Sequence, residues 1–187
     1  LPKIVLMTPS DELEMWKMLS TGQQHKGLAA VRYPRGYSQG EDISLDHETI
    51  EIGKSRIIQK GDKIAYLVFG TLLDTVKKVA KKNGGTVVDM RFVKPIDQNM
   101  IIDICNTHDY IFTVEDNVIL GGAGTAVNEV MSKYSLKNNL VNIGVPDKII
   151  PHGNQSEILS ELGLDEIGIE KITNDHIHNM VEISNKK

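Results

Sequence analysis

The sequence has few of the residues that mark specialised classes of protein. Cys105 is its single cysteine, which excludes an internal disulfide and favours a reducing compartment. No apolar run approaches the ~20 residues that a membrane-spanning helix needs, so no membrane partner is expected. The formal net charge of −4 gives no electrostatic reason to expect a nucleic acid or an anionic membrane surface as partner.

Familiar catalytic and metal-binding signatures are absent as well. The sequence has no HExxH pattern, no Cys/His cluster, no Gly-rich Walker loop and no serine in a nucleophile elbow. His176 and His178 lie two positions apart, so one helical face cannot present both as metal ligands. Cys105 follows Ile101 and Ile104 in an apolar run, which favours a buried, inert thiol over a nucleophile.

Most of the chain alternates between strand and helix patterns. Apolar runs at 64–69, 86–90, 110–114 and 140–143 predict strands, and helical stripes separate and follow them. The connections between these strands and helices are short. Strand-helix alternation of this kind implies right-handed crossovers and a parallel sheet with helices on both faces. Residues 53–187 are therefore expected to form one three-layer α/β/α domain with a mostly parallel sheet. A hairpin turning at Lys60-Gly61-Asp62 would add one antiparallel edge strand, over 55–59.

The first 36 residues predict a separate β-α-β unit. A strand over Lys3–Met7 leads to a helix with Thr8 as N-cap and Pro9 at its first position, whose apolar face would carry Leu13, Trp16 and Leu19. Parallel strands come several to a sheet, so this unit is interpreted as the end of a larger domain. An acidic linker over 37–52 would follow. The alternative that these strands join the later sheet stays open.

The segment Arg32-Tyr33-Pro34-Arg35-Gly36 is the first candidate site. Two arginines around a proline suit the end of a strand, where guanidinium groups reach into a crevice. A planar guanidinium matches the oxygens of a phosphate or a carboxylate, and each charge-assisted bond contributes roughly 1.5–3 kcal/mol. The segment therefore predicts either an anion site or a surface loop with two solvated arginines.

Three other segments could carry chemistry. Glu115-Asp116-Asn117 follows a strand and precedes Gly121-Gly122-Ala123-Gly124, but the glycine spacing does not fit a dinucleotide fingerprint. We expect these glycines to let a helix approach closely, with Glu115 or Asp116 binding loop amides. Asp89, Arg91 and Lys94 predict an ion pair across strand tips. His152 is a lone histidine in a proline-rich loop, where a structural position is favoured over a role in proton transfer.

Several motifs together resemble one enzyme family. They are Met7-Thr8-Pro9-Ser10-Asp11-Glu12, Ala30-Val31-Arg32-Tyr33-Pro34-Arg35-Gly36, Val88-Asp89-Met90-Arg91-Phe92-Val93-Lys94-Pro95, Val114-Glu115-Asp116-Asn117 with the glycines, and Gly144-Val145-Pro146-Asp147. In this order they resemble the C-terminal third of 1-deoxy-D-xylulose-5-phosphate synthases, in the transketolase superfamily. The resemblance implies that residues 1–36 end a central pyrimidine-binding domain and that residues 53–187 are a transketolase C-terminal domain.

The same resemblance implies a function for the complete protein. The family uses thiamine diphosphate and Mg²⁺ to condense pyruvate, after decarboxylation, with glyceraldehyde 3-phosphate, and acts as a homodimer. The reaction opens non-mevalonate isoprenoid synthesis and feeds thiamine formation. Arg35 matches the residue that binds the aldehyde's phosphate, and Arg32 is a supporting neighbour. The motifs that hold the cofactor and metal are missing here, so the piece alone is expected to bind neither and to be inactive.

Alternative interpretations remain at this point. One alternative is that the chain is part of another enzyme of the same superfamily, either a transketolase or the β subunit of a 2-oxo-acid dehydrogenase. Another, from a different class, is that it is a free-standing, non-catalytic α/β interaction module. The first residue is Leu1 and not methionine, so the chain is expected to be a piece whose true N-terminus is not visible. The parent would be cytoplasmic in a bacterium and plastid or apicoplast-targeted in a eukaryote.

Overall fold

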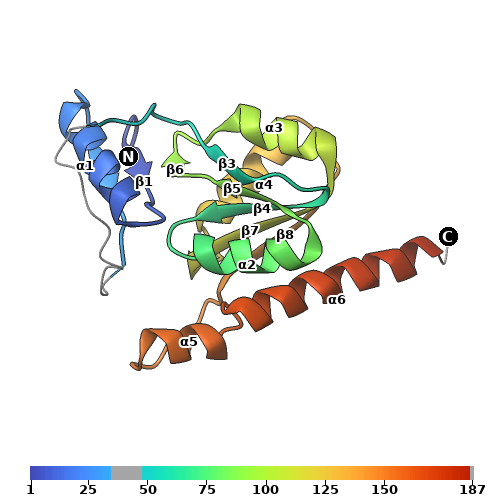
Figure 1. Ribbon diagram of the computed structural model, residues 1–187. Helices are drawn as coiled ribbons and strands as arrows, with labels where there is room; N and C mark the ends of the chain where they lie inside the picture. Colours follow the sequence, from blue (N-terminus) through green and yellow to red (C-terminus); the bar gives the residue numbers. More distant parts are fainter. Residues whose placement is uncertain (35–47, 186–187) are drawn as a thin grey trace.

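The computed structural model describes residues 1–34 and 48–185, with side chains to residue 183. A five-stranded sheet with helices on both faces forms its main body, and a small unit built from the first residues lies beside it (Figure 1). The strand order of the main sheet is β3-β5-β4-β7-β8. All pairs are parallel except β3 with β5. The predicted three-layer α/β/α class, with one antiparallel edge strand, is confirmed.

The bounds of the main-body strands and helices follow the sequence pattern closely. The strands are β3 (Arg56–Gln59), β4 (Lys63–Phe69), β5 (Thr86–Asp89), β7 (His108–Val118) and β8 (Asn139–Val145). The helices are α2 (Leu73–Asn83), α3 (Gln98–Thr107), α4 (Ala123–Lys133), α5 (Gln155–Glu161) and α6 (Glu166–Asn185).

The two faces of the main sheet alternate along each strand, as a pleated sheet requires. Ala65, Leu67 and Phe69 of β4 face α3 and α4, whereas Tyr66 and Val68 face α2 and α6. Each face is a continuous apolar layer, so the strands are buried on both sides. This double burial explains the almost unbroken apolar run of β4.

The predicted hairpin between β3 and β4 is wrong. Strand β5 lies between them and pairs antiparallel with β3 and parallel with β4. The chain from Gln59 to Lys63 can extend over about 13 Å, which is enough to cross two strand spacings of about 4.8 Å. Gly61 crosses the start of β5, where its amide donates to Thr86 Oγ1 over 2.9 Å. A side chain at Gly61 would overlap the Gly84 carbonyl oxygen.

The small unit consists of β1 (Val5–Met7), α1 (Glu12–Gln24) and β2 (Ala29–Val31), with β1 and β2 parallel as predicted. A further strand that the sequence pattern did not indicate, β6 (Phe92–Lys94), pairs antiparallel with β1. The resulting sheet has the order β2-β1-β6. Residues that follow β5 therefore complete the sheet of the N-terminal unit, and Phe92 is fully buried in it.

Aspartate residues cap the starts of two helices, one of which begins later than predicted. Helix α1 starts after Asp11, whose carboxylate accepts the Glu14 amide at 2.7 Å, and not at Thr8. Helix α3 starts after Asp97, whose carboxylate accepts the Met100 amide at 3.2 Å. An aspartate carboxylate is a strong N-cap and favours these starts. Thr8 has another partner, because its amide donates to the Arg91 carbonyl oxygen at 2.8 Å.

The buried face of α1 also differs from the prediction. Glu14, Met18 and Thr21 are buried, whereas Leu19 is 44% exposed. Glu14, Met18 and Thr21 are spaced by four and three residues and so share one helical face; Ser20 beside them is buried as well. The choice of face depends on the partner: α1 covers the small sheet, where Met18 packs near Phe92.

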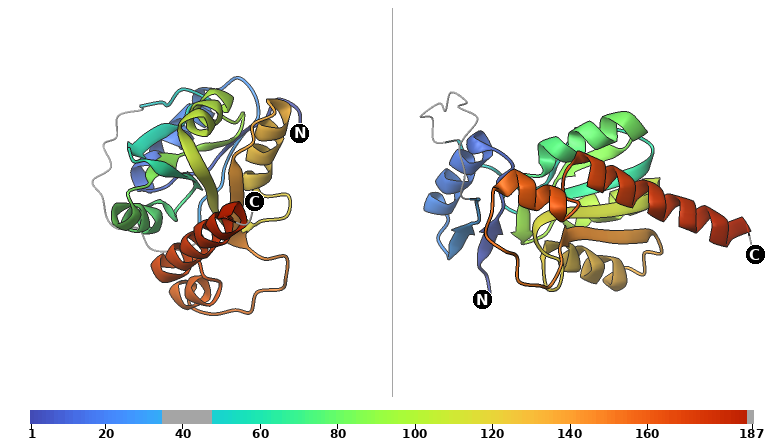
Figure 2. Two further views of the ribbon diagram at one scale, coloured as in Figure 1. Left: turned by 90° about the vertical axis from the view of Figure 1, so that its right-hand side faces the viewer. Right: turned by 90° about the horizontal axis from the view of Figure 1, so that it is seen from below.

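Helix α6 runs across the α2 side of the main sheet and then extends past it (Figure 2). Ile169 and Thr173 are fully buried there, and Ile172 and Ile177 pack against the same core. Beyond them, Val181 and Ile183 are 45% and 51% exposed. None of the described helices is both long and apolar enough to cross a membrane.

Candidate functional site

The polar residues that the sequence singled out meet at the junction between the small unit and the main body. The strands β4, β5 and β7 end at this junction, and the segment from Met7 to Asp11 runs along it. Gly70, directly after β4, has φ +86°, and a side chain there would lie 3.9 Å from the Pro9 carbonyl oxygen. The junction is thus closely packed, with charged groups inside it.

Glu14 is at the centre of a buried ion cluster. Its two carboxylate oxygens accept from Arg91 Nη2 and pair with Arg91 Nε, each over 2.8 Å. Arg56 Nη1 lies 2.9 Å from the same carboxylate. The Glu14 side chain is 2% exposed, so it joins α1 to β3 and to the turn before β6 through desolvated charges. The sequence analysis missed Glu14 and Arg56; the four-residue spacing of Glu14 from Met18 was the available signal.

Asp89 extends the cluster at the end of β5. Arg56 Nε and Nη2 each lie 3.0 Å from Asp89 Oδ2, and Ser10 Oγ donates to the same oxygen at 3.0 Å. Burial raises the pKa of Asp89, and the positive charge of Arg56 partly opposes that rise. The prediction of an ion pair among Asp89, Arg91 and Lys94 is wrong in its partners, because Asp89 pairs with Arg56 of β3 and Arg91 with Glu14 of α1. Lys94 instead donates to the Leu1 carbonyl oxygen at 2.8 Å.

Arg32 is brought to Asp116 from 84 positions away in the sequence. Arg32 Nη1 lies 2.5 Å from Asp116 Oδ1, and Nη2 donates to the Asp116 carbonyl oxygen at 3.1 Å. Thr71 Oγ1 donates to the other carboxylate oxygen, Oδ2, at 3.2 Å. The pair joins the ends of β2, β4 and β7, three strands of two different sheets.

Glu115 confirms the structural role predicted for the acidic segment. Its carboxylate oxygens accept the amides of Ala123 and Gly124, each at 2.8 Å, and so cap the start of α4. Burial raises the pKa of Glu115, and these two hydrogen bonds oppose the rise. A side chain at Gly122 would lie 2.6 Å from the same carboxylate, so the glycine permits the close approach. Glu115 to Asn117 belong to β7 itself, which continues to Val118 after an irregularity.

The sequence also drew attention to Arg35, His152 and Cys105. Arg35 falls outside the described residues, as does most of the expected linker at 37–52. His152 is exposed. Cys105 is 7% exposed, and burial raises its pKa to about 11, which agrees with an inert thiol.

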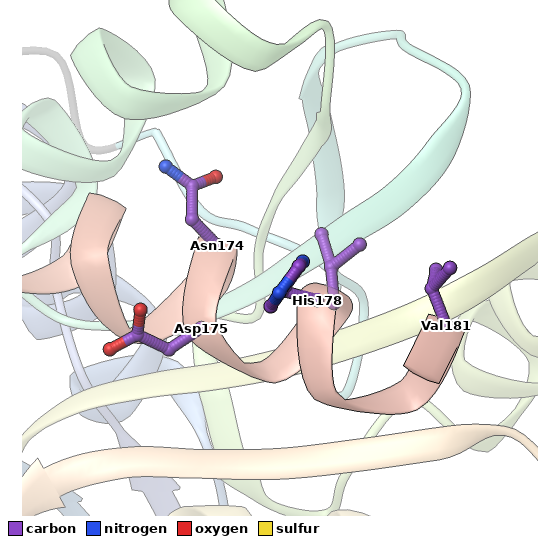
Figure 3. Close-up of a pocket in the computed structure, with 5 residues that line it drawn as sticks. Asn174, Asp175, His178 and Val181 are labelled. Carbon is purple, nitrogen blue, oxygen red and sulfur yellow. The ribbon is translucent and has the colours of Figure 1, made fainter. Parts of the chain in front are cut away.

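Two shallow hollows lie on the surface of the described residues. One, of about 500 Å³, lies along α6 beside Asn174, Asp175, His178 and Val181 (Figure 3). The other, of about 290 Å³, lies beside Lys54 and the start of α3. Within residues 1–34 and 48–185, no three His, Cys, Asp or Glu side chains are placed to hold a metal ion together.

Comparison with known proteins connects this geometry to a family. Residues 53–169 match the family model of the transketolase C-terminal domain. The chain is 47% identical over 177 residues to a 1-deoxy-D-xylulose-5-phosphate synthase of Vibrio campbellii, covering 95% of this chain and 28% of that protein. The chain is 52% identical over 170 residues to the synthase of Pasteurella multocida, and the match covers 91% of this chain and 28% of that protein. The chain thus spans little more than a quarter of the length of these relatives.

Solved structures show the same fold. A split-gene transketolase, described as an inactive β4 tetramer, superposes with a TM-score of 0.83 at 23% identity, covering 94% of this chain and 58% of that one. The transketolase of Campylobacter jejuni superposes with a TM-score of 0.66 at 13% identity, covering 93% of this chain and 26% of that one. The chain belongs to the transketolase C-terminal domain family and resembles the C-terminal part of 1-deoxy-D-xylulose-5-phosphate synthases over nearly its whole length.

Proposed function

We propose that this chain is the C-terminal part of a 1-deoxy-D-xylulose-5-phosphate synthase. The complete enzyme would condense pyruvate, with decarboxylation, and glyceraldehyde 3-phosphate, using thiamine diphosphate and Mg²⁺, and would act as a homodimer. The observation that carries the proposal is the 47% identity to such a synthase across 95% of the chain. Identity at this level over almost the whole chain is far above that of the transketolases that share only the fold.

We assign the cofactor and its metal to the rest of the parent protein. Mg²⁺ beside a diphosphate is held by carboxylates and other oxygen ligands, which must converge on one point. The described residues bring no such group together, and their buried carboxylates already accept from arginines or backbone amides. On this proposal the chain would contribute packing and substrate recognition, and the thiazolium chemistry would belong to the parent's other domains.

Within the chain, we assign recognition of the aldehyde's phosphate to Arg35, with Arg32 as its supporting neighbour. A guanidinium can donate two parallel hydrogen bonds to phosphate oxygens, which a lysine cannot do with the same geometry. Arg32 binds Asp116 through both terminal nitrogens, and this contact supports an indirect role for it.

The test is Arg35→Ala in the complete enzyme. Loss of a charge-assisted contact to phosphate should raise the KM for glyceraldehyde 3-phosphate about tenfold or more, because such a bond contributes roughly 1.5–3 kcal/mol. The KM for pyruvate should stay the same. Lys81→Ala, at an exposed lysine of α2, is the control cation and should change neither value. Equal increases for both substrates would make Arg35 a structural residue.

A second prediction concerns the piece by itself. The 187-residue chain should not bind thiamine diphosphate in calorimetry with Mg²⁺ present, and it should have no synthase activity. Micromolar binding would contradict this assignment of the cofactor site.

A second candidate is a separately encoded subunit that works with a partner chain. The superposition on the split-gene transketolase, over 94% of this chain, favours it. The intact mass of the natural protein and the reading frame of its gene distinguish a subunit from a piece.

A donor and acceptor assay on the complete protein separates the synthase from a transketolase and from a 2-oxo-acid dehydrogenase. A free-standing interaction module would have no activity with any partner chain.

The proposed location follows the proposed parent. A bacterial source would place the enzyme in the cytoplasm, and a eukaryotic one in a plastid or apicoplast.

A further inference from the structure

Strand β2 forms an edge of the small sheet. Within the part of the chain that the structure describes, the strand order β2-β1-β6 gives β2 a partner on one side only. The Leu28 carbonyl oxygen accepts from β1 at 2.9 Å, and the Arg32 amide donates to β1 at 2.8 Å. Successive residues of a strand point their backbone groups to opposite edges. The amides and carbonyl oxygens of Ala29 and Val31 therefore point away from β1.

This edge has none of the features that protect a free strand. The sequence Leu28-Ala29-Ala30-Val31 contains no charged residue and no proline. Beside it, Leu28 is 61% exposed and Tyr33 is 60% exposed. Native proteins protect free edge strands with charges, proline, bulges or a covering element. The composition of β2 is thus typical of a strand inside a sheet.

The small sheet is also too small to be complete. Its strands β1, β2 and β6 have three residues each. Among the described residues, its buried apolar core consists of Val5, Met7, Met18 and Phe92, and Phe92 comes from the far side of β5. Most sheets have four to six strands, and a core of this size contributes little stability. These features indicate that further strands continue the sheet.

We propose that a strand from the part of the parent protein that precedes residue 1 pairs with the free edge of β2. The inference rests on the proposed function, in which this chain is the C-terminal part of a longer enzyme; it covers 28% of the Vibrio campbellii synthase. The N-terminus lies beside β1 in the small unit, so preceding polypeptide joins the molecule there (Figure 1). The added strand bonds to Ala29 and Val31 and covers Leu28 and Tyr33.

Hydrogen exchange followed by mass spectrometry tests the pairing, with the 187-residue chain compared with the complete enzyme. Peptides covering residues 28–33 should exchange at least about tenfold more slowly in the complete enzyme, because outward amides become part of a ladder. Peptides of β4 are the control. This strand is already paired on both sides, so it should exchange slowly in both proteins.

Two neighbouring proline substitutions test the same edge. Ala29→Pro removes an amide that points outward, whereas Ala30→Pro removes one that points to β1. Proline is tolerated on an edge strand only where its missing amide would face solvent. In the 187-residue chain, Ala29→Pro should lower the unfolding midpoint by less than about 2 °C and Ala30→Pro by more than about 5 °C. In the complete enzyme both should lower it by more than about 5 °C.

The outcomes separate this inference from the proposed function. Equal exchange over residues 28–33 in an active complete enzyme, or tolerance of Ala29→Pro there, would overturn only the pairing of β2. Protection that is already present in the 187-residue chain and is lost on about tenfold dilution would assign the edge to a second copy, against the inference. A complete protein without synthase activity would overturn the proposed function, and the exchange comparison would still decide the pairing.

Discussion

Glu14 shows how a single residue joins the two parts of the chain. Its carboxylate is almost fully buried and is shared by Arg56 and Arg91, which come from β3 and from the turn before β6. Charges removed from water are tolerated only when their partners are present. Without Glu14, the largely buried guanidinium of Arg91 would lose its carboxylate partner, whereas Arg56 would keep its contact with Asp89.

We therefore expect Glu14→Ala to lower the free energy of unfolding by about 3 kcal/mol. Urea denaturation of the chain, followed by circular dichroism, measures the change. Glu129→Ala, at an exposed position of α4, is the control and should stay within about 0.5 kcal/mol of wild type. A loss for Glu14→Ala as small as that of the control would show that the cluster contributes little to stability.

Helix α6 illustrates how one element can divide into a packed and an unpacked part. Its first half is tied to the main body by Ile169 and by Thr173, which accepts a hydrogen bond from the buried Tyr66 hydroxyl at 3.0 Å. Lys82 of α2 adds ion pairs to Glu166 and Glu170. The second half extends past the sheet with Val181 and Ile183 exposed. Packing against a core supplies most helix stability, so the two halves should differ.

Two truncations test this division. A chain ending at residue 178 keeps Ile169, Thr173 and Ile177, which pack against the core, so its free energy of unfolding should fall by less than about 1 kcal/mol. A chain ending at residue 168 uncovers the core on that face and should lose more than about 3 kcal/mol. Thermal and urea unfolding measure both. Similar losses in the two chains would mean that the outer half of α6 is packed in solution.

At the scale of the whole molecule, the small unit and the main body are connected through β6. The two faces of the main sheet are covered by residues that all follow residue 57, so the main core does not need the N-terminal unit. Strand β6 does need it, because Phe92 is buried against Val5, Met7 and Met18. The split into 1–36, 37–52 and 53–187 remains a prediction.

A chain that begins at residue 48 tests that split. It should unfold cooperatively, because both main cores are intact, but with a midpoint about 5 °C lower, because Phe92 becomes exposed and Arg56 and Arg91 lose Glu14. Calorimetry measures the midpoint, and hydrogen exchange should show the loss of protection confined to β6 and β3. Loss of all cooperative unfolding would make residues 1–187 a single folding unit.

Local pattern alone determined the alternating order of strands and helices and the role of Glu115 beside the glycines. These features depend on neighbours in sequence, where periodicity and turn chemistry act directly. Only the tertiary structure decided that β5 lies between β3 and β4, that β6 completes the small sheet, and that α1 buries Glu14 and not Leu19. Those choices depend on groups far apart in the chain, and short-range pattern carries no information about which distant charge or strand edge will be the partner.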